Sequence, residues 1–478
     1  MVCGILMVFS DQAFIFLFLP FALAITLAAA RTKAFHIALL CLSLLFFYWT
    51  SGFHTLLLLI SIAVNYAGAL MLSKQKSSAL LCVVVAINVF LLVVFKYAGF
   101  AAGSLAPIFG VQPPEYLTGI ALPIGISFYT FQGISYVVDV WRGDVRPERN
   151  PVTFGAYLSF FPQLIAGPIV RYHDVDQQFK KPILSTDMFA AGASRFTLGL
   201  AKKVLIADSV ALVADAAFAH PGDLGMAAAW LGALAYAIQI YFDFSGYSDM
   251  AIGLGMMFGI RFLENFNHPY GAATVTDFWR RWHISLSSWF RDYVYIPLGG
   301  NRHSQRRTLF NLLTVFALTG LWHGAAWTFL FWGLWHGAFL LLERVIFGNR
   351  EALPTSVMVR LAYFMPVILL GWVLFRAPDI EGFAAYATAM LNPLAGDLAG
   401  FPTEMLLAFS PQTFLAFAVG TSAILLQDRA APLGPAIATI GARGTHQLVR
   451  LCFTTLALVL CAVTIIPQSF SPFLYFRF

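Results

Sequence analysis

The chain has 478 residues, of which 59% are hydrophobic and only 11% are charged. Soluble globular proteins carry roughly 25% charged residues, so this composition excludes an ordinary soluble domain and indicates many membrane-spanning helices. The formal charge of +6 is divided among separate links between apolar segments. Because these cations do not gather in one basic surface, nucleic acid is not the expected partner, whereas the lipid bilayer is.

The first part of the chain contains five apolar segments, most of them close to the roughly 20 residues that a helix needs to cross a bilayer. They cover residues 13–30, 36–50, 55–72, 78–96 and 118–140. Links that contain Lys or Arg alternate with links that contain neither. Cytoplasmic links carry the excess of positive charge, so we expect a periplasmic N-terminus.

A broken apolar segment follows at 154–170, interrupted by Pro162, Gly167 and Pro168. Irregular backbone at membrane depth survives only where protein or water satisfies its polar groups. The pattern therefore predicts a re-entrant or interfacial element and not a complete span.

The next stretch combines surface and spanning character. Residues 185–203 mix cations with small apolar residues and predict an amphipathic helix on the membrane surface. Two spans are expected at 204–218 and 226–244, with the polar cluster 241–249 at the end of the second.

The remaining predicted spans cover 308–322, 325–342, 359–375, 411–427 and 451–467. The whole chain then has about 11–12 spans plus re-entrant pieces. We expect one all-α polytopic membrane domain over residues 1–478. Its catalytic core covers about 118–345, and less characteristic C-terminal helices cover about 355–478.

Two histidines are the candidate chemical groups. His323 follows a predicted span, and His283 follows a stretch rich in Trp and Arg. A desolvated imidazole stays neutral and can accept a proton from a hydroxyl as general base. The alternatives are a histidine hydrogen-bonded between helices for His323 and a solvated histidine on a basic surface helix for His283. His336, in a second Trp-His-Gly sequence, either supports the site or only packs.

Three arginines, Arg280, Arg281 and Arg291, surround His283 in the sequence. Arginine binds phosphate groups in a bidentate manner, so these residues could hold the phosphates of a coenzyme A donor. The alternative is the ordinary positive charge of a cytoplasmic link. No metal-ligand spacing, phosphate-binding loop or nucleophile elbow occurs, so we expect no metal site, no ATP hydrolysis and no serine-hydrolase chemistry.

Five motifs together resemble those of the membrane-bound O-acyltransferase (MBOAT) family, and within it the branch of alginate O-acetyltransferase membrane subunits. They are LPIGISF at 122–128, FPQLIAGPIVRY at 161–172, FDFSGYSD at 242–249, DFWRRWH at 277–283 and GLWHG at 320–324. They follow the family's order over most of residues 10–345, while the sequence after about 378 carries little of this signal.

The resemblance implies a ring of transmembrane helices, with re-entrant and interfacial helices, around a thinned catalytic centre. It places the two family histidines at His323 and His283, with Trp322, Asp243 and His336 beside them or along a tunnel. It also implies transfer of an acyl group from a cytoplasmic thioester such as acetyl-CoA, in the bacterial inner membrane. The acceptor would be an extracytoplasmic polysaccharide such as alginate, reached directly or through a periplasmic acetyltransferase-type partner.

Two rival interpretations share the predicted span count. A polytopic transporter or flippase for a glycan precursor would also contain intramembrane polar residues, but it leaves the clustered Trp-His sequences unexplained. Internal repeats are common in transporters, and this chain shows none. A scaffold for periplasmic transferases, with no chemistry of its own, is the third interpretation.

Overall fold

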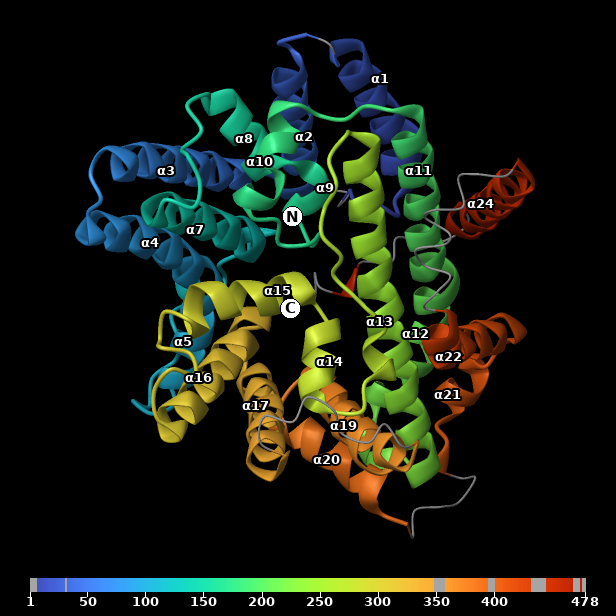
Figure 1. Ribbon diagram of the computed structural model, residues 1–478. Helices are drawn as coiled ribbons and strands as arrows, with labels where there is room; N and C mark the ends of the chain where they lie inside the picture. The colour runs from blue at the N-terminus through green and yellow to red at the C-terminus, as the bar shows by residue number, and fades with distance from the viewer. Residues whose placement is uncertain are drawn as a thin grey trace. The chain divides into compact units, whose positions relative to one another are not determined.

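The computed structural model describes residues 7–30, 32–347, 357–393, 400–430, 444–466 and 473–474. Every regular element in these ranges is a helix, and none of the described residues forms a strand (Figure 1). Cys3, one of the five scattered cysteines, lies outside the described residues. The predicted all-α class is confirmed.

Several helical stretches have the length and composition that a membrane crossing requires. Four are long enough, at Phe35–Lys74, Ser78–Leu105, Met226–Met257 and Trp327–Phe347. Shorter apolar helices occupy Ala13–Ala29, Pro411–Leu426 and Leu451–Ile465. These helices agree with a polytopic membrane protein, while the number of crossings stays a prediction.

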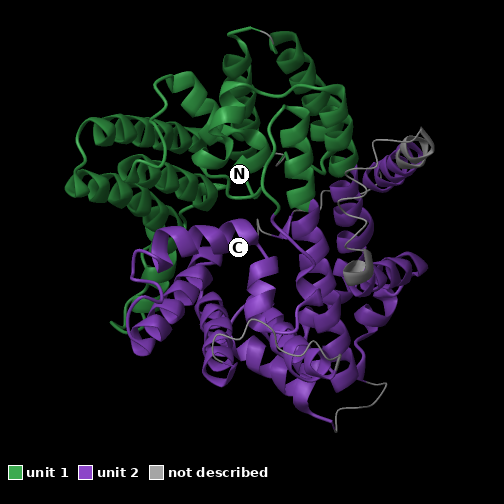
Figure 2. Ribbon diagram, in the orientation of Figure 1, with its two compact units in different colours: residues 1–196, 247–264 green, residues 197–246, 265–478 purple. Residues whose placement is uncertain are grey.

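The chain forms two compact units, drawn in different colours in Figure 2. Unit 1 contains residues 1–196 and 247–264, and unit 2 contains residues 197–246 and 265–478. The two units are defined by their internal packing, which does not decide whether the chain is a single membrane domain. The single domain stays a prediction.

Unit 1 is built from helices of the first part of the chain. They are η1 (Ala13–Phe18), α1 (Leu19–Ala29), α2 (Phe35–Ser51), η2 (Gly52–His54), α3 (Thr55–Lys74), α4 (Ser78–Leu92), η3 (Val93–Tyr97), α5 (Ala98–Leu105), α6 (Glu115–Thr118), α7 (Ile126–Arg142), α8 (Pro151–Ser159), α9 (Phe161–Leu164) and α10 (Tyr172–Lys180). α7 is buried over most of its length and packs against α3 and α4.

A pair of asparagines lies between α3 and α4. Asn65 and Asn88 are both buried, and each side-chain amide donates to the other's oxygen over 3.0 Å. Each amide also donates to a backbone carbonyl one turn earlier, Asn65 to Ser61 and Asn88 to Val84. Polar side chains between membrane helices are stabilised by such reciprocal bonds.

The segment predicted to be irregular is broken in the structure. α8 begins after Asn150, whose side-chain oxygen accepts the Val152 N–H at 2.9 Å, with Pro151 as the first helical residue. The chain leaves the helix at Phe160, forms the single turn α9 and continues irregularly to Arg171. The predicted interruption is confirmed, and the depth of this segment in the membrane stays a prediction.

The remaining helices form unit 2, apart from α11 and α13, whose residues belong to both units. They are α11 (Thr186–Ala201), η4 (Lys202–Ala207), α12 (Asp208–Ala219), η5 (Pro221–Asp223), α13 (Met226–Met257), η6 (Pro269–Gly271), α14 (Val275–Arg281), α15 (Ile284–Phe290), η7 (Arg291–Tyr295), α16 (Gln305–His323), α17 (Trp327–Phe347), α18 (Val357–Val359), η8 (Arg360–Phe364), α19 (Met365–Arg376), α20 (Ile380–Leu391), α21 (Thr403–Ala408), α22 (Pro411–Ala430) and α24 (Gly444–Ile465).

The predicted end of a span at the polar cluster 241–249 is wrong, because α13 continues through this cluster to Met257. The helix tolerates the carboxylates because each has a cationic partner. Lys203 lies 2.8 Å from Asp243, and Arg195 lies 2.8 Å from Asp249. Helical structure is likewise unbroken from α11 through η4 to α12, where we expected a surface helix and a separate span.

α16 and α17 approach each other closely at two glycines. A Cβ atom on Gly320 would overlap the Phe329 carbonyl oxygen, and one on Gly333 would overlap the Phe316 carbonyl oxygen. Glycine therefore allows the two helix backbones to touch, as small residues do between membrane helices. This packing fixes the end of α16, where His323 lies.

Candidate active site

His283 lies at a sharp corner between α14 and α15. Thr274 caps α14 by accepting the Asp277 N–H at 3.0 Å, and α14 ends at Arg281. His283 then adopts φ 46° and ψ 54°, a left-handed conformation that is uncommon for residues other than glycine. Such a conformation persists only where its surroundings hold it, and these conformations cluster at functional sites.

Asn265 holds this corner through four hydrogen bonds. Its backbone carbonyl accepts the Ile284 N–H at 2.9 Å. Its side-chain oxygen accepts the Ser285 N–H at 3.2 Å and the Ser285 hydroxyl at 2.9 Å. The same oxygen lies 3.1 Å from Nδ1 of His283.

These contacts determine which nitrogen of His283 carries the proton. A backbone N–H only donates, so the Asn265 atom that faces Ser285 must be the amide oxygen. An amide oxygen only accepts, so Nδ1 of His283 carries the hydrogen. In a neutral imidazole, Nε2 then has the lone pair and can accept a proton or a hydrogen bond.

His283 is completely buried, and burial lowers its pKa to about 3. Desolvation disfavours the charged form, so the ring is neutral at physiological pH. Phe244 of α13 meets the ring edge to face, with centroids 4.7 Å apart.

His323 is the last residue of α16 and is only 4% exposed. The backbone leaves the helix at Gly324, which is extended. Two aromatic rings meet the imidazole nearly at right angles, Trp332 at a centroid distance of 4.9 Å and Phe375 at 5.4 Å. Trp332 comes from α17 and Phe375 from α19, so three helices surround this histidine.

The structure brings the two predicted histidines together, although 40 positions separate them in the sequence. Their ring centroids lie 6.3 Å apart, and Trp322 contacts both rings, at 5.9 Å from His283 and 5.0 Å from His323. An atom hydrogen-bonded to a ring nitrogen lies about 4 Å from the ring centroid. One small group can therefore reach both imidazoles.

The comparisons with known proteins identify the family of the chain. The family model described as MBOAT, membrane-bound O-acyltransferase family, matches residues 146–377. The probable alginate O-acetylase AlgI of Azotobacter vinelandii is 42% identical over 99% of this chain and 100% of its own length. The chain belongs to the membrane-bound O-acyltransferase family.

Relatives with other names are also similar to this acyltransferase. The peptidoglycan O-acetyltransferase of Helicobacter pylori is 38% identical, over 78% of each chain. The teichoic acid D-alanyltransferase of Bacillus subtilis is 29% identical over 48% of this chain and 64% of its own length. The matched family region contains both His283 and His323.

Trp322, His336 and Asp243, which were predicted to lie near the two histidines, differ in how close they come to them. Trp322 contacts both imidazoles. His336 shares a neighbour with His323, because Trp332 lies 5.1 Å from the His336 ring. Asp243 pairs with Lys203 and is followed in α13 by Phe244, which contacts His283. The roles of all three in the acyltransferase stay predictions.

Two of the three predicted donor-binding arginines form ion pairs with nearby carboxylates. Arg281 pairs with Asp277 at 3.0 Å, one turn earlier in α14, and Arg291 pairs with Asp292 at 2.7 Å. Arg280 is exposed at the end of α14. The assignment of all three arginines to the donor phosphates stays a prediction.

Sequence reasoning missed several residues of the site, above all Asn265 and three aromatic residues, Phe244, Trp332 and Phe375. Asn265 lies among polar residues and carries no spacing signal. The aromatic residues look like any others in apolar spans, so only the packing identifies them. Within the described ranges, no three or more His, Cys, Asp or Glu side chains gather in a way that could hold a metal ion.

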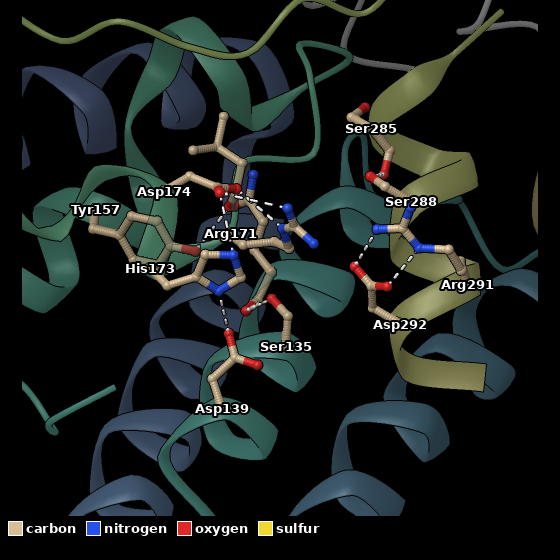
Figure 3. Close-up of polar contacts among 12 residues, drawn as sticks. Ser135, Asp139, Tyr157, Arg171, His173, Asp174, Ser285, Ser288, Arg291 and Asp292 are labelled. Carbon is tan, nitrogen blue, oxygen red and sulfur yellow. Dashed lines mark hydrogen bonds and ion pairs between the residues drawn. The ribbon is translucent and has the colours of Figure 1, made fainter. Parts of the chain in front are cut away.

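Unit 1 contains a different histidine cluster, which Figure 3 shows and which the sequence did not indicate. Nδ1 of His173 lies 2.8 Å from Asp139, and Nε2 lies 3.2 Å from Asp174. Arg171 donates to Asp174 from Nε at 3.0 Å. Both ring nitrogens face carboxylates, so the ring is doubly protonated. The hydrogen bonds to Asp139 and Asp174 raise the pKa of His173 to about 9, although burial opposes the shift.

Proposed function

We propose that this acyltransferase takes an acetyl group from cytoplasmic acetyl-CoA and transfers it across the membrane for O-acetylation of an extracytoplasmic polysaccharide such as alginate. Transfer is direct or passes through a periplasmic partner protein. The observation that carries the proposal is the buried pair of imidazoles, His283 and His323, whose ring centroids lie 6.3 Å apart. The names of the relatives, an alginate O-acetylase and a peptidoglycan O-acetyltransferase, support a polysaccharide as the acceptor.

His323 is the general base of the proposed reaction. It removes the proton from the acceptor hydroxyl while the oxygen attacks the thioester carbonyl carbon. The new C–O bond forms, the C–S bond breaks, and the thiolate of coenzyme A leaves. The proton held by His323 then passes to the thiolate or to water, which returns the imidazole to its neutral state.

His283 orients the donor or lines its passage. Its Nδ1–H is occupied by Asn265, so only Nε2 is oriented to receive a partner from the reacting groups. A fixed tautomer gives this nitrogen one role and prevents it from acting as a competing donor.

A catalytic centre between two compartments solves a problem of permeability. The phosphates of acetyl-CoA prevent it from crossing the apolar core, whereas its acetyl group is small enough to be handed over. Under this proposal the chain lies in the inner membrane with its N-terminus in the periplasm. Arg280, which is exposed, is proposed to contact the donor phosphates from the cytoplasmic side together with Arg281 and Arg291.

The test compares His323→Ala with His220→Ala, a control at an exposed histidine after α12. Purified protein receives labelled acetyl-CoA and a polysaccharide acceptor. Loss of a general base lowers the rate by about 10²–10⁴-fold, so we expect His323→Ala to lose nearly all transfer and His220→Ala to retain it. Wild-type transfer by His323→Ala, at equal expression, contradicts the assignment. A transporter shows no transfer at all, even in the wild type.

A further inference from the structure

A short C-terminal segment, Phe473 and Leu474, is buried although it lies far in sequence from every motif discussed so far. Phe473 is 2% exposed and Leu474 is 4% exposed. Figure 1 shows the two residues as a short red piece beside α13, and the contacts below identify what they touch.

The first contact is a hydrogen bond to a buried carboxylate. The Leu474 N–H donates to Oδ2 of Asp243 at 2.9 Å, across 231 positions of sequence. The other carboxylate oxygen of Asp243 lies 2.8 Å from Nζ of Lys203, with which it forms an ion pair.

The charges around Asp243 explain why this carboxylate accepts a peptide N–H. Lys203 is shared with Asp208, whose carboxylate lies 2.6 Å from Nζ. One buried cation, Lys203, thus faces two carboxylates. A buried carboxylate requires hydrogen-bond donors to replace water, and the Leu474 N–H supplies one.

The second contact leads to the proposed active site. The Phe473 ring lies 6.0 Å from the ring of Phe244, which meets His283 at 4.7 Å. Asp243 and Phe244 are neighbours in α13, and Phe473 and Leu474 are neighbours in the C-terminal segment. Two adjacent contacts fix both the position and the register of this segment on α13.

We propose that Phe473 and Leu474 form a positioning element of the active site, which holds Phe244 against His283. Neither residue touches the reacting groups, so both act through Phe244. The kinetic part of the inference rests on the function proposed above. The seating of the segment is testable without any catalysis.

The kinetic test is a double-mutant cycle with Phe473→Ala and Phe244→Ala in the full-length protein. A misplaced catalytic group can cost about 10²-fold, and a displaced neighbour less, so we expect Phe473→Ala to lower kcat roughly tenfold. The KM for acetyl-CoA should change less than about twofold, because uniform donor binding is retained. In the Phe244→Ala background, Phe473→Ala should have no further effect.

Matched variants separate positioning from loss of folding. Phe453→Ala removes an aromatic ring that is 60% exposed on α24, and it should leave kcat unchanged. Leu474→Pro removes the donated N–H and should lower kcat more than Leu474→Ala, which keeps it. Additive effects of Phe473→Ala and Phe244→Ala, or equal rates for the two Leu474 variants, overturn the proposal.

The second test measures seating alone. Leu474→Cys is introduced into a chain whose native cysteines are replaced by alanine, and its labelling by a polar maleimide is timed. We expect protection, and faster labelling once Phe244→Ala is added, while Phe453→Ala has no effect. Rapid labelling of Leu474→Cys without Phe244→Ala overturns the proposal, as does a labelling rate that Phe244→Ala leaves unchanged. Both outcomes can be read even if the protein shows no acyl transfer.

Discussion

The two units contain histidines in opposite environments. In unit 1, His173 is half-buried, and both of its nitrogens lie beside carboxylates. In unit 2, His283 is completely buried and has an amide oxygen at Nδ1 and an aromatic ring at its side. The pKa of His173 is raised to about 9, and that of His283 is lowered to about 3.

This contrast shows that the surroundings and not the residue type decide what a histidine can do. A ring that is already protonated cannot act as a base, so the His173 cluster serves as an ion-pair network. A neutral ring with a defined lone pair can accept a hydrogen bond, which suits the orienting role proposed for His283. A search for histidines in the sequence alone would have treated both in the same way.

After the loss of His323 itself, the largest effect should come from removing the residue that keeps the His283 corner in place. Asn265→Ala deletes an acceptor for the Ser285 N–H and hydroxyl and releases Nδ1 of His283. Misplacing a catalytic group costs up to about 10²-fold, so we expect kcat to fall between about 10-fold and 100-fold. The measurement is acetyl transfer at saturating donor.

The control for this prediction is Asn267→Ala, two positions away, where the side chain is exposed. It should leave kcat unchanged. A fall in kcat of similar size in both variants would indicate general damage to the segment. An unchanged kcat in Asn265→Ala would show that the tautomer of His283 set by Asn265 does not matter for the reaction.

A smaller effect should distinguish the charged histidine of unit 1. The folded pKa of His173 lies above its unfolded value of about 6.5, so its ion pairs stabilise the fold fully below pH 6.5. This contribution is lost as the pH rises through about 9. His173 is half-exposed, so we expect a loss below about 1 kcal/mol.

The measurement is thermal unfolding of wild type and His173→Gln at pH 6 and pH 10. Wild type should lose more stability between these pH values than the variant, because the glutamine does not titrate. Equal pH dependence in the two proteins would show that the ring is not held in its protonated form by Asp139 and Asp174.

The smallest effect should come from His336, which is as buried as His283 but has a different setting. Its ring lies 5.3 Å from Trp279 and 5.1 Å from Trp332, and neither ring nitrogen has a hydrogen-bond partner among the described protein atoms. Replacing an unsatisfied buried polar group by an apolar one is nearly neutral or stabilising. We therefore expect His336→Leu to change kcat by less than about twofold and leave the melting temperature close to that of wild type.

This variant tests whether burial of a histidine suffices for function. A large fall in kcat with an unchanged melting temperature would assign His336 to the catalytic machinery. A large fall in the melting temperature would show that His336 stabilises the fold more than its ring contacts suggest.

The sequence predicted the helical class and the two histidines, because apolar segments and the Trp-His motifs are local signals. It could not predict their approach to 6.3 Å, which depends on the glycine contacts between α16 and α17 and on the left-handed corner at His283. The polar cluster of α13 was misplaced because its cationic partners lie in other helices. The burial of Phe473 and Leu474 had no sequence signal, since nothing near them resembles a motif.

The reciprocal amides of Asn65 and Asn88 have a consequence for how the chain is assembled in the bilayer. α3 and α4 form a hairpin joined by only three residues, 75–77. If the two helices insert one residue out of alignment, both amides lose their partner and face hydrocarbon, which costs free energy for each unsatisfied group. The pair therefore favours the native alignment of the two helices over an alignment shifted by one residue.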